Sequence, residues 1–346
     1  MHAFSGSTMG RLRGTVLLAC ALCGGVQAAE RAPAPQGSAA YLSYPDRPIR
    51  FIVPYPPGGG TDIVARLIAQ RLAEALGQQV VIDNRGGANA IIGTGIAAKA
   101  APDGYTMLFA LPASVAVNPN LYHDLPYEPL RDFAPVIQLL SFPLLLAAHP
   151  GVPASNVREL IALAQAKPGQ LNFASSGNGS APHLAMEMFK SMAKVQMVHV
   201  PYKGGGPAMN DLLAGQVQIM AGTMISELPF VKAGRLKGLA VTTAKRAVVL
   251  PDVPTVSESL PGYEISNWHG ILVPRATAPA IVMRLNRETL KILQTQEARE
   301  RFASQGAEPA GGTPAAFDGL IKAELVRYRQ VLRDAGVQTE ASRGIR

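Results

Sequence analysis

The stretch Arg50-Phe-Ile-Val-Pro-Tyr-Pro-Pro-Gly-Gly-Gly-Thr-Asp-Ile-Val-Ala-Arg-Leu-Ile68 predicts a buried strand, a glycine-rich turn and an amphipathic helix, in that order. Residues 51 to 55 are mostly apolar, and two prolines end the run. The helix carries apolar residues on one face and is expected to end at Gly77, which suits a C-terminal cap. The rest of the chain is interpreted around this turn.

The turn itself is suited to a small anion. Gly58, Gly59 and Gly60 permit positive φ angles and a close approach of the backbone to a guest, while Thr61 and Asp62 offer an N-cap. Unpaired amides and the positive end of the helix dipole then face the turn. A turn that only reverses the chain remains an alternative. Nucleotide-binding versions are set aside, because neither a phosphate-loop lysine nor a complete G-x-G-x-x-G frame is present.

The N-terminus resembles a secretory leader. Arg11 and Arg13 precede the apolar run 14–25, which is too short to span a membrane, and small residues before Ala29 favour cleavage after residue 28. We therefore expect residues 1–28 to be a signal peptide and the protein to be periplasmic. Residues 29–43, rich in Ala, Pro, Gly and Ser, are expected to be a linker.

Both cysteines, Cys20 and Cys23, lie in this leader. A mature chain without cysteine has no disulfide, thiolate metal site or cysteine nucleophile. An alternative is lipoprotein processing, which would leave a lipid-bearing Cys20 as a membrane anchor.

The length of the chain indicates how many lobes it can form, and its charge distribution argues against one class of partner. A chain of 346 residues with 48% hydrophobic content can form two lobes, each with its own core. The net charge of +8 is spread along the sequence without a basic run, so nucleic-acid binding is not expected.

Strands alternate with helices along the chain, which predicts parallel, doubly wound α/β sheets. Residues 119–138 are expected to be irregular, Phe142 to Ala148 to form a first crossing between lobes, and Trp268 to Val273 to form the return crossing. Three helices, at 279–293, 297–304 and 314–335, are expected to close the first lobe.

Two further glycine-rich turns precede predicted helices. The first, Ser175-Ser-Gly-Asn-Gly-Ser-Ala-Pro-His183, follows a short strand and mirrors the turn at residues 58–60. The second is Tyr202-Lys-Gly-Gly-Gly-Pro207. Two lobes that each offer a helix start to a shared ligand would form an anion site between them.

Catalytic signals are weak. His183 and His199 lie near the glycine-rich turns, but neither belongs to a motif with a nucleophile or a second metal ligand, so both are interpreted as structural. No metal site, cofactor or enzymatic activity is expected.

The chain resembles the periplasmic substrate-binding receptors of tripartite tricarboxylate transporters, the Bug receptors, over essentially its whole mature length. The motifs that carry the resemblance are Tyr44-Pro-Asp-Arg-Pro-Ile-Arg, Val53-Pro-Tyr-Pro-Pro-Gly-Gly-Gly-Thr-Asp, Ala101-Pro-Asp-Gly-Tyr-Thr, Ala174-Ser-Ser-Gly-Asn-Gly-Ser, His199-Val-Pro-Tyr-Lys-Gly, Leu250-Pro-Asp-Val-Pro-Thr-Val and Gln305-Gly-Ala-Glu-Pro.

The resemblance implies a two-lobed periplasmic-binding-protein fold, with two crossings between lobes, that closes on a small organic carboxylate. The implied division is lobe 1 at 44–146, lobe 2 at 147–268, and a C-terminal part of lobe 1 at 269–346. The implied ligand-binding residues are Tyr55, Gly59, Gly60, Thr61, Asp62, Ser175, Gly177, Asn178, Gly179, Ser180 and Tyr202. The implied partners are a carboxylate ligand and integral-membrane permease subunits, and we expect a monomer.

Two segments depart from the family pattern. Residues 221–224 read Ala-Gly-Thr-Met where many relatives carry an Asp-Asn pair, and residues 111–117 lack the usual Gly and Ser character. We expect both to shape the outer part of the pocket. The alternatives to a transport receptor are an extracytoplasmic carboxylate sensor and an enzyme that acts on a carboxylate; the enzyme would need an acid–base pair that the sequence does not offer.

Overall fold

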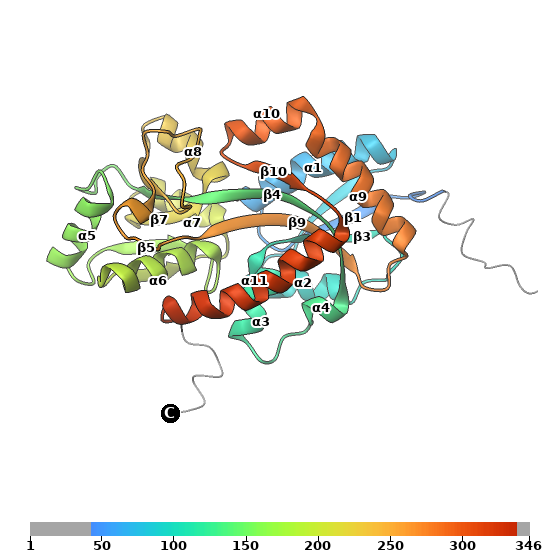
Figure 1. Cartoon of the computed structure of the whole chain (residues 1–346), viewed down its shortest axis with the longest axis horizontal. Coiled ribbons are helices and arrows are strands. Elements are labelled where there is room, and N and C mark those ends of the chain that lie inside the picture. Colours follow the sequence, from blue (N-terminus) through green and yellow to red (C-terminus); the bar gives the residue numbers. More distant parts are fainter. Residues whose placement is uncertain (1–42, 338–346) are drawn as a thin grey trace, which may run out of the picture.

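The computed structural model describes residues 43–337, which form two α/β lobes side by side (Figure 1). The strands follow the order β2-β1-β3-β9-β4-β7-β5-β6, with β10 and β8 also paired to β4. The predicted fold class, a two-lobed α/β fold, is confirmed. Within residues 43–337, no helix is long and apolar enough to cross a membrane. The predicted leader and Cys20 lie outside the described residues.

Lobe 1 begins with the expected strand, turn and helix. Strand β1 (Ile49–Val53) is parallel to β2 (Val80–Asn84) and β3 (Thr106–Ala110). Helix α1 (Gly60–Leu76) follows β1, and α2 (Ile91–Ala98) follows β2. The N-cap of α1 is Gly59 instead of Thr61 or Asp62, and Gly77 ends the helix in the left-handed conformation, as the sequence predicts.

Lobe 2 repeats this arrangement with different strands. The parallel strands β5 (Asn172–Ser175), β6 (Val198–Pro201) and β7 (Ile219–Thr223) form its centre, and β8 (Lys237–Val241) completes it. The helices between them are α5 (Val157–Ala166), α6 (Ala181–Ala193), α7 (Gly205–Leu213) and α8 (Met224–Lys232).

Strand β4 (Phe133–Ala148) belongs to both lobes. Up to Pro143 it pairs with β9 (Ser266–Pro274), and from Leu144 onward it pairs with β7 and β8. The expectation that residues 119–138 are irregular is therefore wrong for 133–138, and also for 119–121 and 129–132, which lie in short helices. Prolines in this segment argue against a strand, but one of them, Pro135, lies at a register shift, where a missing amide is tolerated.

The changes of strand partner indicate where the lobes meet. Residues 256 to 265 still pack in the lobe 2 core, whereas β9, from Ser266, pairs only with lobe 1 strands. These transitions, at 143/144 and 265/266, lie close to the boundaries 146/147 and 268/269 inferred from the sequence, which stay a proposal.

The C-terminal helices do more than close lobe 1. Helices α9 (Pro279–Gln294) and α10 (Gln296–Ser304) lead to β10 (Glu308–Gly311), a strand that the sequence analysis missed. Helix α11 (Pro314–Asp334), assigned to lobe 1 from the sequence, runs along both lobes (Figure 1). Phe317 packs in a lobe 1 core, whereas Tyr328 packs in the core of lobe 2.

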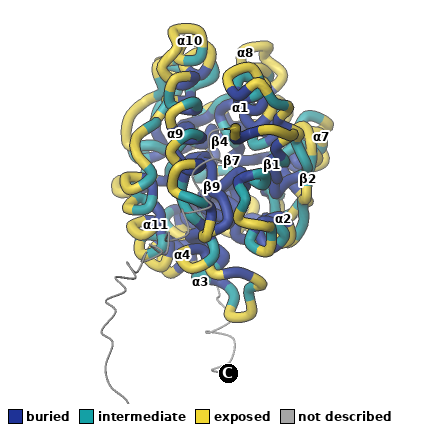
Figure 2. Tube along the Cα trace, turned by 90° about the vertical axis from the view of Figure 1, so that its right-hand side faces the viewer, coloured by how far each residue is buried: buried dark blue, intermediate teal, exposed yellow. Residues whose placement is uncertain are grey.

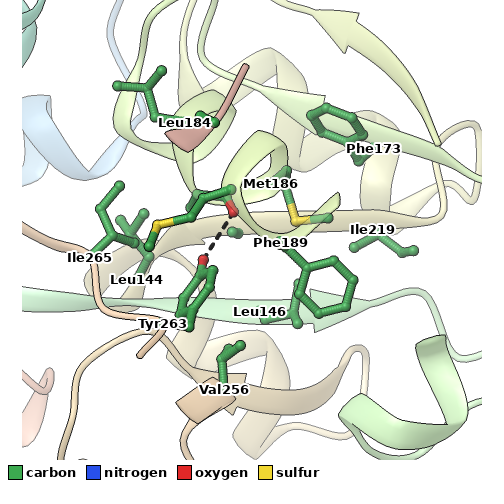
Figure 3. Close-up of a cluster of buried hydrophobic side chains, with 14 of the residues drawn as sticks. Leu144, Leu146, Phe173, Leu184, Met186, Phe189, Ile219, Val256, Tyr263 and Ile265 are labelled. Atoms are coloured by element: carbon green, nitrogen blue, oxygen red, sulfur yellow. Dashed lines mark hydrogen bonds between the residues drawn. The ribbon is translucent and has the colours of Figure 1, made fainter. Parts of the chain in front are cut away.

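The buried residues concentrate in the sheet, and the helices expose their outer faces (Figure 2). Figure 3 shows the lobe 2 core, in which Phe189 lies beside the β4 residue Leu146, and to which Phe173 and Ile219 also belong. The Tyr263 hydroxyl donates to the Ala185 carbonyl at 3.0 Å and joins the return segment to α6. Met186 and Met188 of α6 are buried in this core, so these methionines serve packing.

The segment after β3 is compact. Residues Ala113–Val117 form a π-helical turn, followed by two short helices, α3 (Asn118–Leu121) and α4 (Pro129–Asp132). A 3₁₀ turn, Val256–Glu258, lies in the return segment. π-helical turns occur frequently at functional sites, and this one leads into the interlobe region.

Candidate functional site: an interlobe cavity

A cavity of about 40 Å³ lies between the lobes. It exceeds the roughly 10–15 Å³ that one water molecule needs, so it can admit a small guest. The residues that line it are Tyr55, Pro56, Gly59, Gly60, Thr61, Leu111, Ala113, Ser176, Ser180, Ala181, Pro182, Gly205, Met220, Thr223, Ser226 and Asn267. None of these described lining residues carries a charged side chain.

Four helices begin at this cavity. Their N-caps are Gly59 for α1, Ser180 for α6, Gly204 for α7 and Thr223 for α8, and the first residues of each helix contribute to the lining. The first amides of a helix have no intrahelical partner, and the helix dipole makes this end positive. The cavity is therefore electropositive without any cationic side chain.

An ionised carboxylate supports the first loop from behind. Asp62 accepts hydrogen bonds from the Gly58 amide at 3.1 Å, from Arg66 at 2.9 Å and from Asn84 at 3.0 Å. Burial alone would raise the pKa of Asp62, but these hydrogen bonds outweigh it and hold the pKa below its usual value. Asp62 thus holds the loop in shape and does not face the cavity.

Two neutral histidines support the second loop. Nδ1 of His183 accepts from the Gly179 amide at 3.0 Å, and Nε2 of His199 lies 2.6 Å from the Ser175 hydroxyl, which also accepts from Gly177. The rings stack with centroids 4.1 Å apart. Burial lowers the pKa of His183 to about 3 and that of His199 to about 4, and the nearby Lys190 charge acts in the same direction.

The Tyr55 ring is held in the cavity wall by a buried amide network. Its hydroxyl donates to Asn89, whose amide contacts Asn118 at 3.3 Å. Ala88, Asn89 and Ala90 all have positive φ. Three consecutive left-handed residues other than glycine are strained, and the hydrogen bond from Asn118 to the Asn89 carbonyl, at 2.9 Å, stabilises the strained backbone.

The two lobes touch through backbone around the cavity. A Cβ placed on Gly59 would lie 3.5 Å from the Gly206 amide nitrogen, and a Cβ on Gly60 would overlap the Thr223 hydroxyl. The closeness of these atoms shows that the lobes are closed on the cavity. A side chain at Gly60 therefore requires the Thr223 side chain to move or the lobes to separate.

The turn between β7 and α8 supplies hydroxyls. The Thr223 and Ser226 hydroxyls are 2.7 Å apart, and the Ser226 hydroxyl also lies 2.9 Å from the Thr223 carbonyl. Glu227, fully buried, accepts from the Gly222 amide at 3.0 Å, and burial raises its pKa well above the usual value, so this side chain is held neutral.

The residues predicted to bind a ligand fall into two groups. Those that line the cavity are Tyr55, Gly59, Gly60, Thr61 and Ser180. Those that lie outside the lining are Asp62, Ser175, Gly177, Asn178, Gly179 and Tyr202. In the second group, Asp62, Ser175 and Gly179 engage the supporting contacts described above, Asn178 is exposed, and the Tyr202 hydroxyl donates to Asp211 at 2.6 Å.

Other lining residues were not named from the sequence. Leu111, Ala113 and Thr223 belong to the two segments that depart from the family pattern. That departure is the sequence feature that could have identified them as lining residues. Asn267 had only a weak signal, a polar residue directly before an apolar strand. Neither His183 nor His199 lines the cavity, and within residues 43–337 no group of three potential metal ligands occurs.

Comparison with known proteins agrees with this architecture. Residues 64–337 match the model of the family described as tripartite tricarboxylate transporter family receptor. The chain is 40% identical to protein BugT of Bordetella pertussis over 298 residues, covering 86% of this chain and 91% of BugT.

Solved structures show the same fold. A protein from R. palustris, solved with adipate, is 38% identical with a TM-score of 0.83, covering 85% of this chain and 98% of that protein. MatC from Rhodopseudomonas palustris, solved with bound malate, is 32% identical with a TM-score of 0.80, covering 84% of this chain and 100% of MatC. The periplasmic binding protein BugD is 34% identical with a TM-score of 0.82, covering 85% of this chain and 99% of BugD. The chain therefore belongs to the tripartite tricarboxylate transporter receptor family.

Proposed function

We propose that the protein is a periplasmic receptor that binds a small organic carboxylate in the interlobe cavity. The observation that carries this proposal is the convergence of four helix N-termini on a cavity without charged side chains. Amides and hydroxyls hold an anion reversibly and offer no acid–base pair for a reaction. The adipate and malate in the related structures support the same ligand class.

Within this proposal, the receptor delivers its ligand to the membrane subunits of a tripartite tricarboxylate-type transporter. The family match supports this role. Export through the leader at residues 1–28 places the mature protein in the same compartment as the receptor face of such a transporter. Loss of uptake on deletion of the gene distinguishes a transport receptor from a carboxylate sensor, because a sensor mutant would still take up the acid when the transporter is supplied.

A thermal-shift screen of small organic acids, followed by calorimetry, tests the binding proposal. A ligand at one hundred times its Kd stabilises the folded protein by about 2.7 kcal/mol. We expect at least one carboxylate to raise the melting temperature, while its amide analogue has no effect. If no carboxylate raised it, or if acid and amide acted equally, the electropositive cavity would not be a carboxylate site.

Ligand binding is also expected to involve hinge closure. The chain changes strand partners at 143/144 and leaves the lobe 2 core for β9 at 265/266, so bending should concentrate at these two crossings. Small-angle scattering should show a smaller radius of gyration with ligand. An unchanged radius at saturation would contradict a hinge.

A further inference from the structure

One side-chain donor at the cavity, Nδ2 of Asn267, has no hydrogen-bond partner within residues 43–337. Asn267 lies at the start of β9, opposite Phe142, where the chain passes from lobe 2 into lobe 1. Its side chain lines the cavity, and the residue is only 5% exposed. Its oxygen accepts from the Trp268 amide at 2.9 Å.

This contact determines the orientation of the side-chain amide. A backbone N–H can only donate, so the atom of Asn267 that faces Trp268 must be the oxygen. Nδ2 therefore points the other way, and it has no hydrogen-bond partner among the described residues. Asn267 lines the cavity and is largely buried, so a guest that accepts from Nδ2 gains a hydrogen bond in a site with little competing solvent.

The Thr223 and Ser226 hydroxyls also line the cavity and can accept as well as donate. The remaining lining residues outside the glycine-rich turns are apolar, among them Leu111, Ala113 and Met220. No acidic side chain is present in the described lining to balance an ammonium group, and four positive helix ends oppose one.

We propose that Asn267 is a specificity-determining residue, whose Nδ2 donates to a neutral oxygen, a hydroxyl or a carbonyl, on the ligand's non-carboxylate end. The ligand class is then a small hydroxy- or oxo-carboxylate, in preference to an unsubstituted acid and to an amino acid. This inference rests on the proposed function, since the helix N-termini hold the carboxylate.

Two matched sets of acids test the proposal by calorimetry: propionate, lactate and alanine, and succinate, malate and aspartate. Within the set that binds, the hydroxy acid should bind about tenfold more tightly than the unsubstituted acid, the value of one hydrogen bond, and the amino acid should bind most weakly. Asn267→Leu should bring the ratio of hydroxy acid to unsubstituted acid close to one.

Asn267→Asp is a second variant, and it keeps the acceptor for the Trp268 amide. The proposal can therefore still be tested if Asn267→Leu does not fold. The introduced carboxylate should lower the affinity for the hydroxy acid by at least tenfold. The affinity for the amino acid should rise relative to the affinity for the hydroxy acid. Asn210→Asp, at an exposed position of α7, is the matched control for added charge and should leave both ratios unchanged.

The outcomes separate the two proposals. If the wild-type protein binds acids with no preference for the hydroxy member, or if Asn267→Leu and Asn267→Asp keep that preference, the role of Asn267 is overturned while the carboxylate receptor stands. If no member of either set binds the wild type, whereas the wider acid screen finds a ligand that lacks a hydroxyl or carbonyl group, the ligand class is overturned. If no acid of any kind binds, both proposals fall.

Discussion

Two glycine-rich loops face each other across the cavity, and in each loop a side chain behind the loop accepts a hydrogen bond from a glycine amide. The accepting side chain is charged in lobe 1 and neutral in lobe 2. In lobe 1, the ionised Asp62 accepts from the Gly58 amide behind the loop. In lobe 2, the neutral His183 accepts from the Gly179 amide. Both anchors organise amides for an anion, but one depends on a charge and the other on the absence of a charge. The loops should therefore respond differently to acid.

The glycines of the two loops also differ in purpose. Gly59 has a φ of −86°, which any residue adopts, and a Cβ there would make ordinary contact with α7 of the other lobe, whereas a Cβ on Gly60 would overlap the Thr223 hydroxyl. Gly177 and Gly179 have φ of +127° and +75°, which favour glycine whatever the space around them. A side chain at Gly60 should hinder closure, whereas a side chain at Gly177 or Gly179 should strain the loop itself.

The largest expected effect is therefore on binding, from Gly60→Ala. The added Cβ would overlap the Thr223 hydroxyl in the closed state but strains nothing within lobe 1. We expect a loss of ligand affinity of at least about a thousandfold, about 4 kcal/mol, with a free energy of unfolding of the ligand-free protein close to that of wild type. Calorimetry and urea unfolding measure the two quantities.

Gly319→Ala is the matched control for this variant. Gly319 lies within α11, and a Cβ there would meet no atom within 4 Å. Its affinity should equal that of the wild type. Gly60→Ala with wild-type affinity would mean that the ligand is bound without the closed contact between Gly60 and Thr223.

The second largest expected effect is on the stability of the protein in acid, and it arises from His199 in lobe 2. The folded protein keeps His199 neutral down to a pKa of about 4, whereas the unfolded chain binds a proton near 6.5. Between these values the unfolded state binds more protons, so the free energy of unfolding falls as the pH drops from about 6.5 to about 4. Each pKa unit corresponds to about 1.4 kcal/mol, and solvent screening reduces the effect because His199 is only partly buried, so we expect His199 to account for a loss of about 2 to 3 kcal/mol.

His199→Gln isolates this contribution, because the glutamine amide can still contact the Ser175 hydroxyl and does not titrate. The fully buried His269, whose pKa burial lowers to about 3, contributes equally in both proteins. His183 stacks on His199, whose charge lowers the pKa of His183, so the difference between the proteins reports His199 together with its coupling to His183. Urea unfolding at several pH values without ligand should show a smaller acid loss in the variant. Equal losses in the two proteins would show that His199 is not held neutral.

The sequence predicted the repeated motif well but not how the lobes join. Strand, glycine turn and helix are local patterns, so residues 50–77 formed as expected, with only the N-cap displaced to Gly59. Strand β4 was truncated because proline usually ends strands, and only pairing with β9 shows that Pro135 lies at a register shift. The resemblance also implied Asp62 and Ser175 as ligand-binding residues, and the structure places both outside the cavity lining; matching motif positions do not show which way a side chain points, so their direct role stays a prediction.

The smallest expected effect, from Asp62→Asn, sharpens the comparison of the loops. The Arg66 side chain is 53% exposed, so its ion pair with Asp62 contributes little, whereas the buried contacts to Gly58 and Asn84 require an acceptor. Asparagine offers one oxygen for these donors, so we expect a loss of about 1 kcal/mol at pH 7.

The pH dependence of that loss differs from that of His199. The folded-state pKa of Asp62 lies below its usual value of 3.8, so its contribution to stability is complete above that value and is lost only as the pH falls below it. The difference in unfolding free energy between wild type and Asp62→Asn should therefore be the same at pH 7 and pH 5, the range in which the difference between wild type and His199→Gln begins to develop. If the Asp62→Asn difference instead changed between pH 7 and pH 5, Asp62 would not be the ionised anchor, and the contrast between a charged first loop and a neutral second loop would not hold.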